Sequence, residues 1–165
     1  MIRALVDEAL RYTRSLTFEL SSPLLYELGL GPAVESLAEQ MEKKHGLRME
    51  VHDEGCAGPM DDAVKVVLYK AVRELLMNAV KHARARRASV RLRQDEDSVE
   101  IVVEDDGIGF SQEAATATAR AGGFGLFSIR EGLRHCGGGF SIRSAGGRGT
   151  HAVLRVPLKA VTGGG

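Results

Sequence analysis

The order of helix and strand patterns along the chain predicts an α+β fold, a two-layer sandwich in which helices cover one face of a mixed, mostly antiparallel sheet. Two observations lead to this expectation. Apolar residues recur with the helical period in four segments, and they alternate with polar residues or run together in five shorter ones. The 165 residues, of which 44% are hydrophobic, suit one ordinary domain with its own core.

The first third of the chain predicts two helices. Residues 4–20 carry a loose apolar stripe without glycine, and Pro23 breaks the pattern. A second helix is expected over residues 32–45, with Pro32 at its first position and Gly46 just past its end. Proline suits a helix start because the first turn needs no N–H group, and glycine suits the position after a helix because it adopts left-handed torsion angles.

A strand and a long helix follow. Residues 47–52 alternate between apolar and polar, which indicates a strand with one buried face, and turn residues fill 53–59. Asp61 or Asp62 can cap a third helix that continues to about Arg84. The apolar residues of this helix recur every three or four positions, as in an amphipathic helix that covers a core.

The second half of the chain predicts two hairpins separated by a loop and a helix. The paired strand segments are 88–94 with 98–104, and 140–144 with 150–157. The segment 98–104 is nearly all apolar at its centre, so we expect it in the middle of the sheet. Between the hairpins lie a Gly- and Ala-rich loop over 105–124 and a fourth helix over 125–135.

Composition and charge exclude several classes of protein. Lys and Arg total 22 and so do Asp and Glu, and this zero net charge argues against a nucleic-acid-binding domain, which would carry a basic face. No apolar run approaches the ~20 residues of a membrane span, and the N-terminus has no secretory signal. Cys56 and Cys136 show neither metal-binding nor disulfide spacing. We therefore expect a cytoplasmic location, whether or not a longer parent protein is membrane-anchored, and no nucleic-acid partner.

The third predicted helix carries the first candidate site residues. Glu74, Asn78 and His82 follow one another at intervals of four, so they share one side of the helix, and Lys81 lies beside them. On a helical wheel, Asn78 and His82 fall at the border of the apolar stripe. An amide at this border can hold Mg²⁺ or its waters through its oxygen. Taken alone, the same pattern also fits a solvated helix face.

Two glycine-rich segments carry further candidates. In VEDDGIGF a buried strand ends at Asp105 and runs into Gly107 and Gly109. A carboxylate there can accept a hydrogen bond from an exocyclic amine, and the glycines let the main chain approach a flat ligand. In GGFGLFSIREGL, Gly123 and Gly125 precede the fourth helix, whose free N–H groups can cradle phosphates. An acidic strand end with a turn and a flexible helix start are the plain alternatives.

A fourth segment, GGRGTHAVLRVPL, turns at Gly147 and Gly149 and enters the last strand at Thr150, which alone fits a plain hairpin. The order of the four segments is more specific than any one of them. Together they resemble the ATP-binding domain shared by sensor histidine kinases, type II topoisomerases, Hsp90-like chaperones and MutL-like repair ATPases, over about residues 47–158. ELLMNAVKHA is similar to the N box of this family, and VEDDGIGF and GGFGLFSIREGL are similar to its two glycine boxes. FGLFSIREGL and a short lid over about 111–121 most resemble the nitrate-sensor-like subfamily of histidine kinases.

The resemblance implies a Bergerat-type ATP-binding fold and a role for each matching residue. Asp105 would accept a hydrogen bond from the adenine amine, and Thr150 would support the same edge of the base. Asn78 would coordinate Mg²⁺ between the phosphates and would be catalytic together with Glu74, which matches the position that activates water in the ATPase branches. The other residues expected to bind the nucleotide are Lys81, His82, Gly107, Gly109, Gly123, Phe124, Gly125 and Leu126, with Arg130 as an addition.

The resemblance also implies a reaction and its partners. A kinase of this type binds Mg·ATP and passes the γ-phosphoryl group to a histidine on a dimerisation helix. The partners implied are this phosphoacceptor domain, a response regulator with a LuxR-type output, and a second copy of the full-length protein. The one His-Asp pair, His52-Asp53, lies in a segment that alternates like a strand, so we expect the acceptor histidine outside this chain.

Residues 10–42 resemble, more loosely, the second helix of the dimerisation hairpin and its connection to the catalytic domain. The expected organisation is therefore a helical remnant of the hairpin with a linker helix over 1–45, an ATP-binding catalytic domain over 46–160 and a flexible tail over 161–165. Two alternatives remain open: an anti-sigma-factor serine kinase, which needs no histidine substrate, and a non-catalytic nucleotide-binding regulatory module of the same fold.

Overall fold

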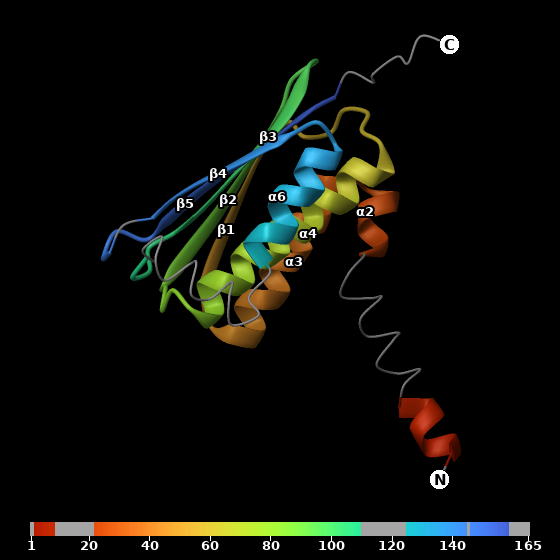
Figure 1. Ribbon diagram of the computed structural model, residues 1–165, viewed down its shortest axis with the longest axis vertical. Helices are drawn as coiled ribbons and strands as arrows, with labels where there is room; N and C mark the ends of the chain where they lie inside the picture. The colour runs from red at the N-terminus through yellow and green to blue at the C-terminus, as the bar shows by residue number, and fades with distance from the viewer. Residues whose placement is uncertain (1, 9–21, 110–124, 145, 159–165) are drawn as a thin grey trace.

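The computed structural model describes residues 2–8, 22–109, 125–144 and 146–158. The helices over residues 23–27, 30–45, 62–81 and 125–135 lie on one face of a five-stranded sheet, while the opposite face of the sheet is left without a described helix (Figure 1). The predicted α+β fold, a two-layer sandwich, is thereby confirmed.

Apart from one short additional helix, the described elements follow the expected order. The helices are α2 (Pro23–Glu27), α3 (Leu30–His45), α4 (Asp62–Lys81) and α6 (Gly125–His135), and residues 2–8 are also helical. The strands are β1 (Arg48–Glu54), β2 (Arg87–Gln94), β3 (Ser98–Asp105), β4 (Gly139–Ser144) and β5 (Thr150–Pro157).

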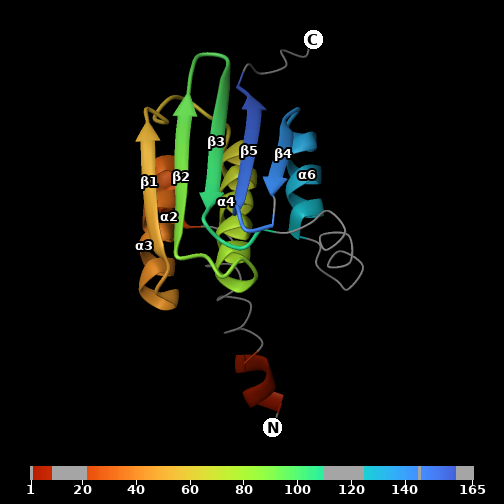
Figure 2. The same ribbon diagram turned by 90° about the vertical axis from the view of Figure 1, so that its left-hand side faces the viewer.

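The strands lie in the order β1-β2-β3-β5-β4 (Figure 2). β1 and β2 are parallel, and the other three neighbouring pairs are antiparallel, so the sheet is mixed and mostly antiparallel as predicted. The apolar strand β3 is central, which confirms the expectation drawn from its composition. The register places Asp105, at the end of β3, opposite Thr150, at the start of β5.

The core lies between the sheet and the helices. Alternate side chains of β3 are buried at Val99, Ile101 and Val103, because successive residues of a strand point to opposite faces of the sheet. The apolar stripe of α4 covers them with side chains such as Leu68 and Leu76, both fully buried. Burial of such a side chain stabilises the fold by about 1.5–3 kcal/mol relative to exposure.

α3 contributes to the same core, where Leu30 and Val34 are buried in one cluster with the residues of α4 and of the sheet. α3 therefore packs as part of the sandwich. The expected boundary between residues 45 and 46, which would assign α3 to a linker helix, stays a prediction.

The starts of the first helices differ from expectation. α3 begins two residues earlier than expected, so Pro32 is its third residue. The chain enters through Gly29 with a φ of 95°, and a proline in the first turn leaves no hydrogen bond unmade. α2 was not expected; it begins at Pro23 and is anchored by the fully buried Leu25. Gly46, with a φ of 72°, closes α3 as predicted.

α4 ends at Lys81, three residues before the expected end at Arg84. The carbonyl oxygen of Asn78 accepts the N–H groups of both His82, at 2.9 Å, and Ala83, at 3.2 Å. Arg84 then takes a left-handed φ of 49°. Because no glycine marks this turn, the periodic pattern of the helix did not reveal it. His82 is consequently an exposed residue just past the helix, and its expected place at the border of the core was wrong.

Smaller differences concern β1 and the start of α4. β1 extends to Glu54, two residues beyond the predicted strand. Asp61 holds the N-cap position of α4, but its side chain makes no capping hydrogen bond. The predicted helix over 4–20 is described only in part, because residues 9–21 lie outside the described residues, as do 110–124 with the expected lid. None of the described helices has the length and hydropathy needed to cross a membrane.

Candidate functional site

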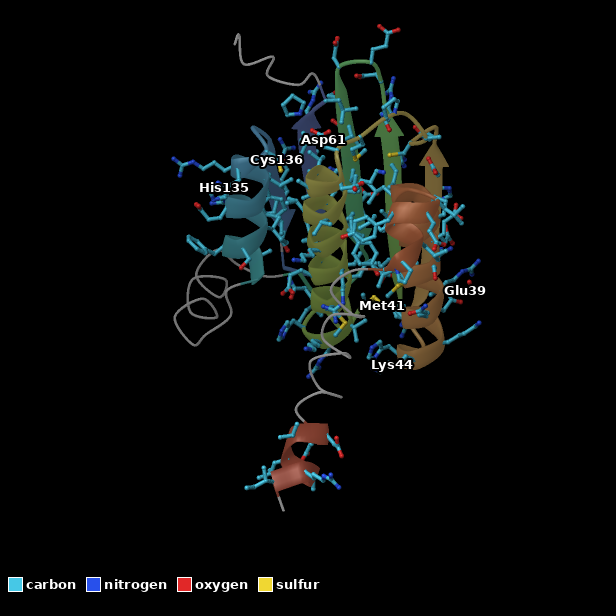
Figure 3. All side chains as sticks on the ribbon, turned by 90° about the vertical axis from the view of Figure 1, so that its right-hand side faces the viewer. Glu39, Met41, Lys44, Asp61, His135 and Cys136 are labelled. Carbon is cyan, nitrogen blue, oxygen red and sulfur yellow. The ribbon has the colours of Figure 1, made fainter. Side chains whose placement is uncertain are left out.

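Four elements bring the predicted site residues to one end of the sandwich. α4 and α6 run in opposite directions, since Asp61 before α4 and His135 at the end of α6 lie toward the same end of the molecule (Figure 3). The last turns of α4, the first turn of α6, the end of β3 and the start of β5 therefore meet at the other end (Figure 2). Three close contacts connect them: Gly107 with Ala83, Gly149 with Asp105, and Gly125 with Glu74.

Asp105 is a half-buried carboxylate held in place by its neighbours. Its Oδ1 accepts the N–H of Gly107 at 2.9 Å, and the side chain of Thr150 also forms a hydrogen bond with it. Thr150 is held in turn by Ser144, whose Oγ lies 3.4 Å from the Thr150 hydroxyl. Burial raises the pKa of Asp105 above its ordinary value, and the hydrogen bonds from the main chain of Gly107 and from both the side chain and the main chain of Thr150 oppose this rise in part. The result is a fixed hydrogen-bond acceptor at the end of the central strand.

The next residue, Asp106, has a different task. It is exposed, and its Oδ1 accepts the N–H groups of Arg86 at 2.8 Å and of Arg87 at 2.9 Å. These hydrogen bonds lower the pKa of Asp106. Asp106 therefore stabilises the connection between α4 and β2. Asp105 and Asp106 thus have different roles, although the two adjacent aspartates look equivalent in the motif.

The glycines of the VEDDGIGF segment are required by contacts within the protein. A Cβ placed on Gly107 would lie 2.6 Å from the Cβ of Ala83 and would collide with the Ala83 carbonyl oxygen. Ile108 donates its N–H to that same oxygen at 2.7 Å, which locks the end of β3 to the end of α4. Gly109 follows with a left-handed φ of 70°. Sequence reasoning expected Gly107 to make room for a ligand and missed this contact, for which the sequence holds no separate signal.

Glu74 and Asn78 lie one helical turn apart on α4, and both are half-buried. The carboxylate of Glu74 rests against Gly125, the first residue of α6, where a built Cβ would lie 2.7 Å from Glu74 Cδ. Sequence reasoning placed Glu74 and Gly125 at the site but did not foresee that these two residues touch. Lys81 and His82, the other candidates from this segment, are exposed.

The start of α6 supplies the remaining described candidates. Gly125 and Leu126 are half-buried in its first turn. Gly123 and Phe124 lie outside the described residues, so their expected contacts with phosphate stay predictions. Arg130 lies over the ring of Phe140 on β4, with its Cζ 5.9 Å from the ring centroid. No pattern in the sequence indicates this cation–π contact, and a role for Arg130 at the phosphates stays a prediction.

The donor set fits a metal that arrives with a phosphate ligand. Within the described ranges, no group of three or more His, Cys, Asp or Glu side chains gathers as a resident metal site would require. Asn78, one turn after Glu74 on α4, carries one amide oxygen that can serve as a ligand. Mg²⁺ is commonly held in this way, by one or two protein oxygens together with phosphate oxygens and waters.

The histidines are all described, and none lies on a helix with an acid after it. His52 lies in β1, as the alternation predicted, and its exposed ring is 3.8 Å from Glu50. Its neighbour Asp53 accepts the N–H groups of Gly55 and Cys56, which gives the aspartate a structural task. The remaining histidines lie at helix ends or on β5: His45, His82, His135 and His151.

Comparison with known proteins identifies the family. A family model described as "Histidine kinase-, DNA gyrase B-, and HSP90-like ATPase" matches residues 63–160. Sensor histidine kinase NarS of Mycobacterium tuberculosis is 34% identical over 146 residues, which cover 88% of this chain and 33% of that protein. Oxygen sensor histidine kinase NreB of Staphylococcus carnosus is 31% identical over 157 residues, which cover 95% of this chain and 44% of that protein.

Among solved structures, the blue-light activated histidine kinase of Erythrobacter litoralis EL346 has a similar fold, with a TM-score of 0.65 and 20% identity over 78% of this chain and 42% of that one. The chain thus spans less than half the length of each of these relatives. The family model matches most of the described sandwich, including the site segments that meet at one end of it. The chain therefore belongs to the histidine kinase-, DNA gyrase B- and HSP90-like ATPase family.

Proposed function

We propose that this chain is the catalytic, ATP-binding part of a two-component sensor histidine kinase. The observation that carries the proposal is the half-buried carboxylate of Asp105, held by Gly107 and Thr150 at the end of the central strand. This acceptor faces the same end of the sandwich as Asn78 and the start of α6. The relatives described above support a histidine kinase, because both curated relatives carry that name.

Asp105 binds the adenine edge in this proposal. A carboxylate has about four acceptor positions, so one hydrogen bond from Gly107 and two from Thr150 still leave room for an exocyclic amine. Adenine offers such an amine, whereas guanine presents a carbonyl oxygen at the same place and would leave two acceptors facing each other. The site therefore prefers adenine nucleotides.

The residues of α4 and α6 bind the phosphates. Asn78 contributes its amide oxygen to Mg²⁺, while the main-chain N–H groups around Gly123 and Gly125 hold the β- and γ-phosphates. Lys81 and His82, exposed at the end of α4, lie close enough in sequence to Asn78 to contact phosphate oxygens. When bound with the nucleotide, Mg²⁺ neutralises charge on the transferring phosphoryl group.

The acceptor of the γ-phosphoryl group is a histidine outside this chain. Phosphoryl transfer depends on position more than on chemical activation, so the acceptor must reach the γ-phosphate at the start of α6. His52 is unsuited to this, because it lies within an edge strand of the sheet beside Glu50. The partners in this account are the phosphoacceptor domain of the same kinase, a response regulator with a LuxR-type output, and a second copy of the kinase in the full-length dimer.

Finer assignments belong to the same proposal. They are a nitrate-sensor-like subfamily, a cytoplasmic location of the domain, and the division into a hairpin remnant over 1–45, a catalytic domain over 46–160 and a tail over 161–165. An anti-sigma-factor serine kinase and a non-catalytic module are the weaker candidates, because the relatives described above are sensor kinases.

Base selectivity tests the proposal. In a thermal-shift assay with Mg²⁺, ADP and ATP should raise the melting temperature of the chain, and GDP and GTP should not. A hydrogen bond to a charged group contributes about 1.5–3 kcal/mol, which corresponds to about a ten- to hundredfold difference in affinity. Equal stabilisation by ATP and GTP would contradict the assignment of Asp105.

A further inference from the structure

Glu74 carries a negative charge at the place where the proposed phosphates must bind. It lies on α4 one turn before Asn78, and its carboxylate rests against Gly125 at the start of α6. The side chain is half-buried, so solvent screens its charge only in part. Among residues 22–109, 125–144 and 146–158, the Glu74 carboxylate forms no hydrogen bond or ion pair with a cationic side chain. The carboxylate therefore brings a negative charge to the first turn of α6.

A second anion brought to this place meets repulsion. The start of a helix attracts anions through its free N–H groups, and in the ligand-free chain the Glu74 carboxylate already lies there. A nucleoside diphosphate without a bound metal ion would bring several more negative charges to the same turn. Two like charges about 4 Å apart in water repel enough to change an affinity about fivefold, and partial burial strengthens the effect.

We propose that Glu74 makes this site select metal-bound over metal-free nucleotide. The inference rests on the proposed function, because it takes the start of α6 to be the phosphate cradle. A Mg²⁺ ion bound to the phosphates cancels two of their charges and is attracted by the carboxylate, while Asn78 offers it an oxygen ligand. Glu74 thus weakens the binding of bare nucleotide and leaves the Mg²⁺ complex favoured.

A purely structural role for Glu74 predicts something different. If the side chain only supported Gly125 by filling space, glutamine would serve equally well, since it has the same shape without the charge. The exchange of Glu74 for glutamine therefore separates charge from packing. Glu74→Asp keeps the charge and shortens the side chain, so it should retain most of the selection.

The experiment is titration calorimetry on the full chain with three probes: ADP with excess Mg²⁺, ADP with excess EDTA, and adenosine. Glu74→Gln should bind metal-free ADP about five- to tenfold more tightly than the wild type. Its affinity for Mg·ADP should change less, and its affinity for adenosine should not change. Glu100→Gln, on the helix-free face of β3, is the matched control and should behave like the wild type for all three probes.

Each other outcome is decisive. The inference is wrong if Glu74→Gln binds metal-free ADP no more tightly than the wild type does. It is also wrong if the substitution lowers the affinities for metal-free ADP and for Mg·ADP equally, because the charge then does not select between the two forms. Retained binding of adenosine by the variant shows that its base pocket is folded. If the wild-type chain binds neither adenosine nor Mg·ADP, the proposed function itself fails, and this result is distinguishable from failure of the inference alone.

Discussion

Asp105 and Thr150 form the last pair of the ladder between β3 and β5, and the threonine side chain forms a hydrogen bond with the aspartate carboxylate. Gly149, just before Thr150, packs so closely on Asp105 that a built Cβ would lie 3.0 Å from the Asp105 carbonyl carbon. Gly149 thus packs on the main chain of Asp105, and Thr150 holds its carboxylate where burial raises the pKa. A carboxylate kept in such a place at a cost in stability is typical of a binding site.

Asp105→Asn should stabilise the ligand-free chain at pH 7. Because the pKa of Asp105 is raised in the folded state, the folded chain binds this proton more tightly than the unfolded chain. The stability of the fold therefore falls as the pH rises from the ordinary pKa of an aspartate to the raised pKa of Asp105, and it stays lower at neutral pH. Asparagine carries no charge to bury, so the variant should melt at a higher temperature at pH 7 and lose its preference for ATP over GTP.

The neighbouring aspartate gives a matched control. The pKa of Asp106 is lowered by its hydrogen bonds to the main chain, so its contribution is present above its ordinary pKa and is lost as the pH falls through the lowered value. Asp106→Asn should therefore melt at a lower temperature than the wild type at pH 7 and should keep base selectivity. Shifts of the same sign for the two variants in thermal melts at pH 7 would contradict the separate tasks assigned to them.

Gly107→Ala should destabilise the fold, because the new Cβ would meet the main chain of Ala83 rather than a flexible side chain. Overpacking of this kind typically costs about 1–3 kcal/mol. Gly146→Ala is the control, since a Cβ there meets nothing within 4 Å. Urea unfolding followed by circular dichroism measures both. Equal midpoints for the two variants would show that the contact between β3 and α4 is looser than described.

Asn78→Ala should weaken the binding of Mg·ATP and leave the binding of adenosine unchanged. Loss of an oxygen ligand to the metal should lower the affinity about tenfold or more, a cost comparable with that of removing a partner of a metal ligand. Gln40→Ala removes an exposed amide from α3 and serves as the control. Titration calorimetry with both ligands gives the result, and wild-type affinity of Asn78→Ala for Mg·ATP would place Asn78 on an ordinary helix face.

Asp53→Ala should cost about 1–2 kcal/mol of stability, comparable with the loss of a helix cap. Oδ1 of Asp53 accepts the N–H groups of Gly55, at 3.1 Å, and of Cys56, at 2.7 Å. The other carboxylate oxygen lies against Gly31 in the first turn of α3, where a negative charge is favourable. A large effect here would support a structural rather than a phosphoacceptor role for the His-Asp pair.

Glu54→Ala is the comparison for this prediction, because Glu54 lies next in sequence and pairs at 3.7 Å with Arg91, which is also exposed. Exposed ion pairs contribute about 0–1 kcal/mol, so this variant should unfold near the wild-type midpoint. Equal losses in chemical unfolding for both variants would refute the capping role of Asp53.

The fold was largely predictable because apolar residues recur with different periods in its helices and in its strands. The alternation in β2 and the apolar run of β3 distinguish half-buried from central strands, and the stripe of α4 has the period of a covering helix. The misplaced boundaries lie where local signals are weak or ambiguous. Pro23 both ends one helical pattern and begins another helix, and Arg84 adopts a left-handed φ of 49° that glycine would ordinarily mark.

The site was predictable as a set of segments but not as a set of contacts. The resemblance names Glu74, Gly107 and Gly125, yet the sequence cannot show that Gly125 touches Glu74 or that Gly107 packs on Ala83. Such contacts join residues that are far apart in the chain, and they depend on how closely α4 approaches α6 and β3. The different tasks of Asp105 and Asp106 are likewise set by the register of the sheet.

Phosphoryl transfer tests the central claim most directly. The wild-type chain is incubated with Mg²⁺ and γ-labelled ATP, alone and together with the phosphoacceptor hairpin of its parent protein supplied as a separate chain. The account predicts no label on the chain alone, because all five of its histidines lie outside a phosphoacceptor helix. It predicts label on the added hairpin that is lost in acid and kept in base, as a phosphohistidine is. An unlabelled hairpin, label on His52, or acid-stable label on a serine would contradict it.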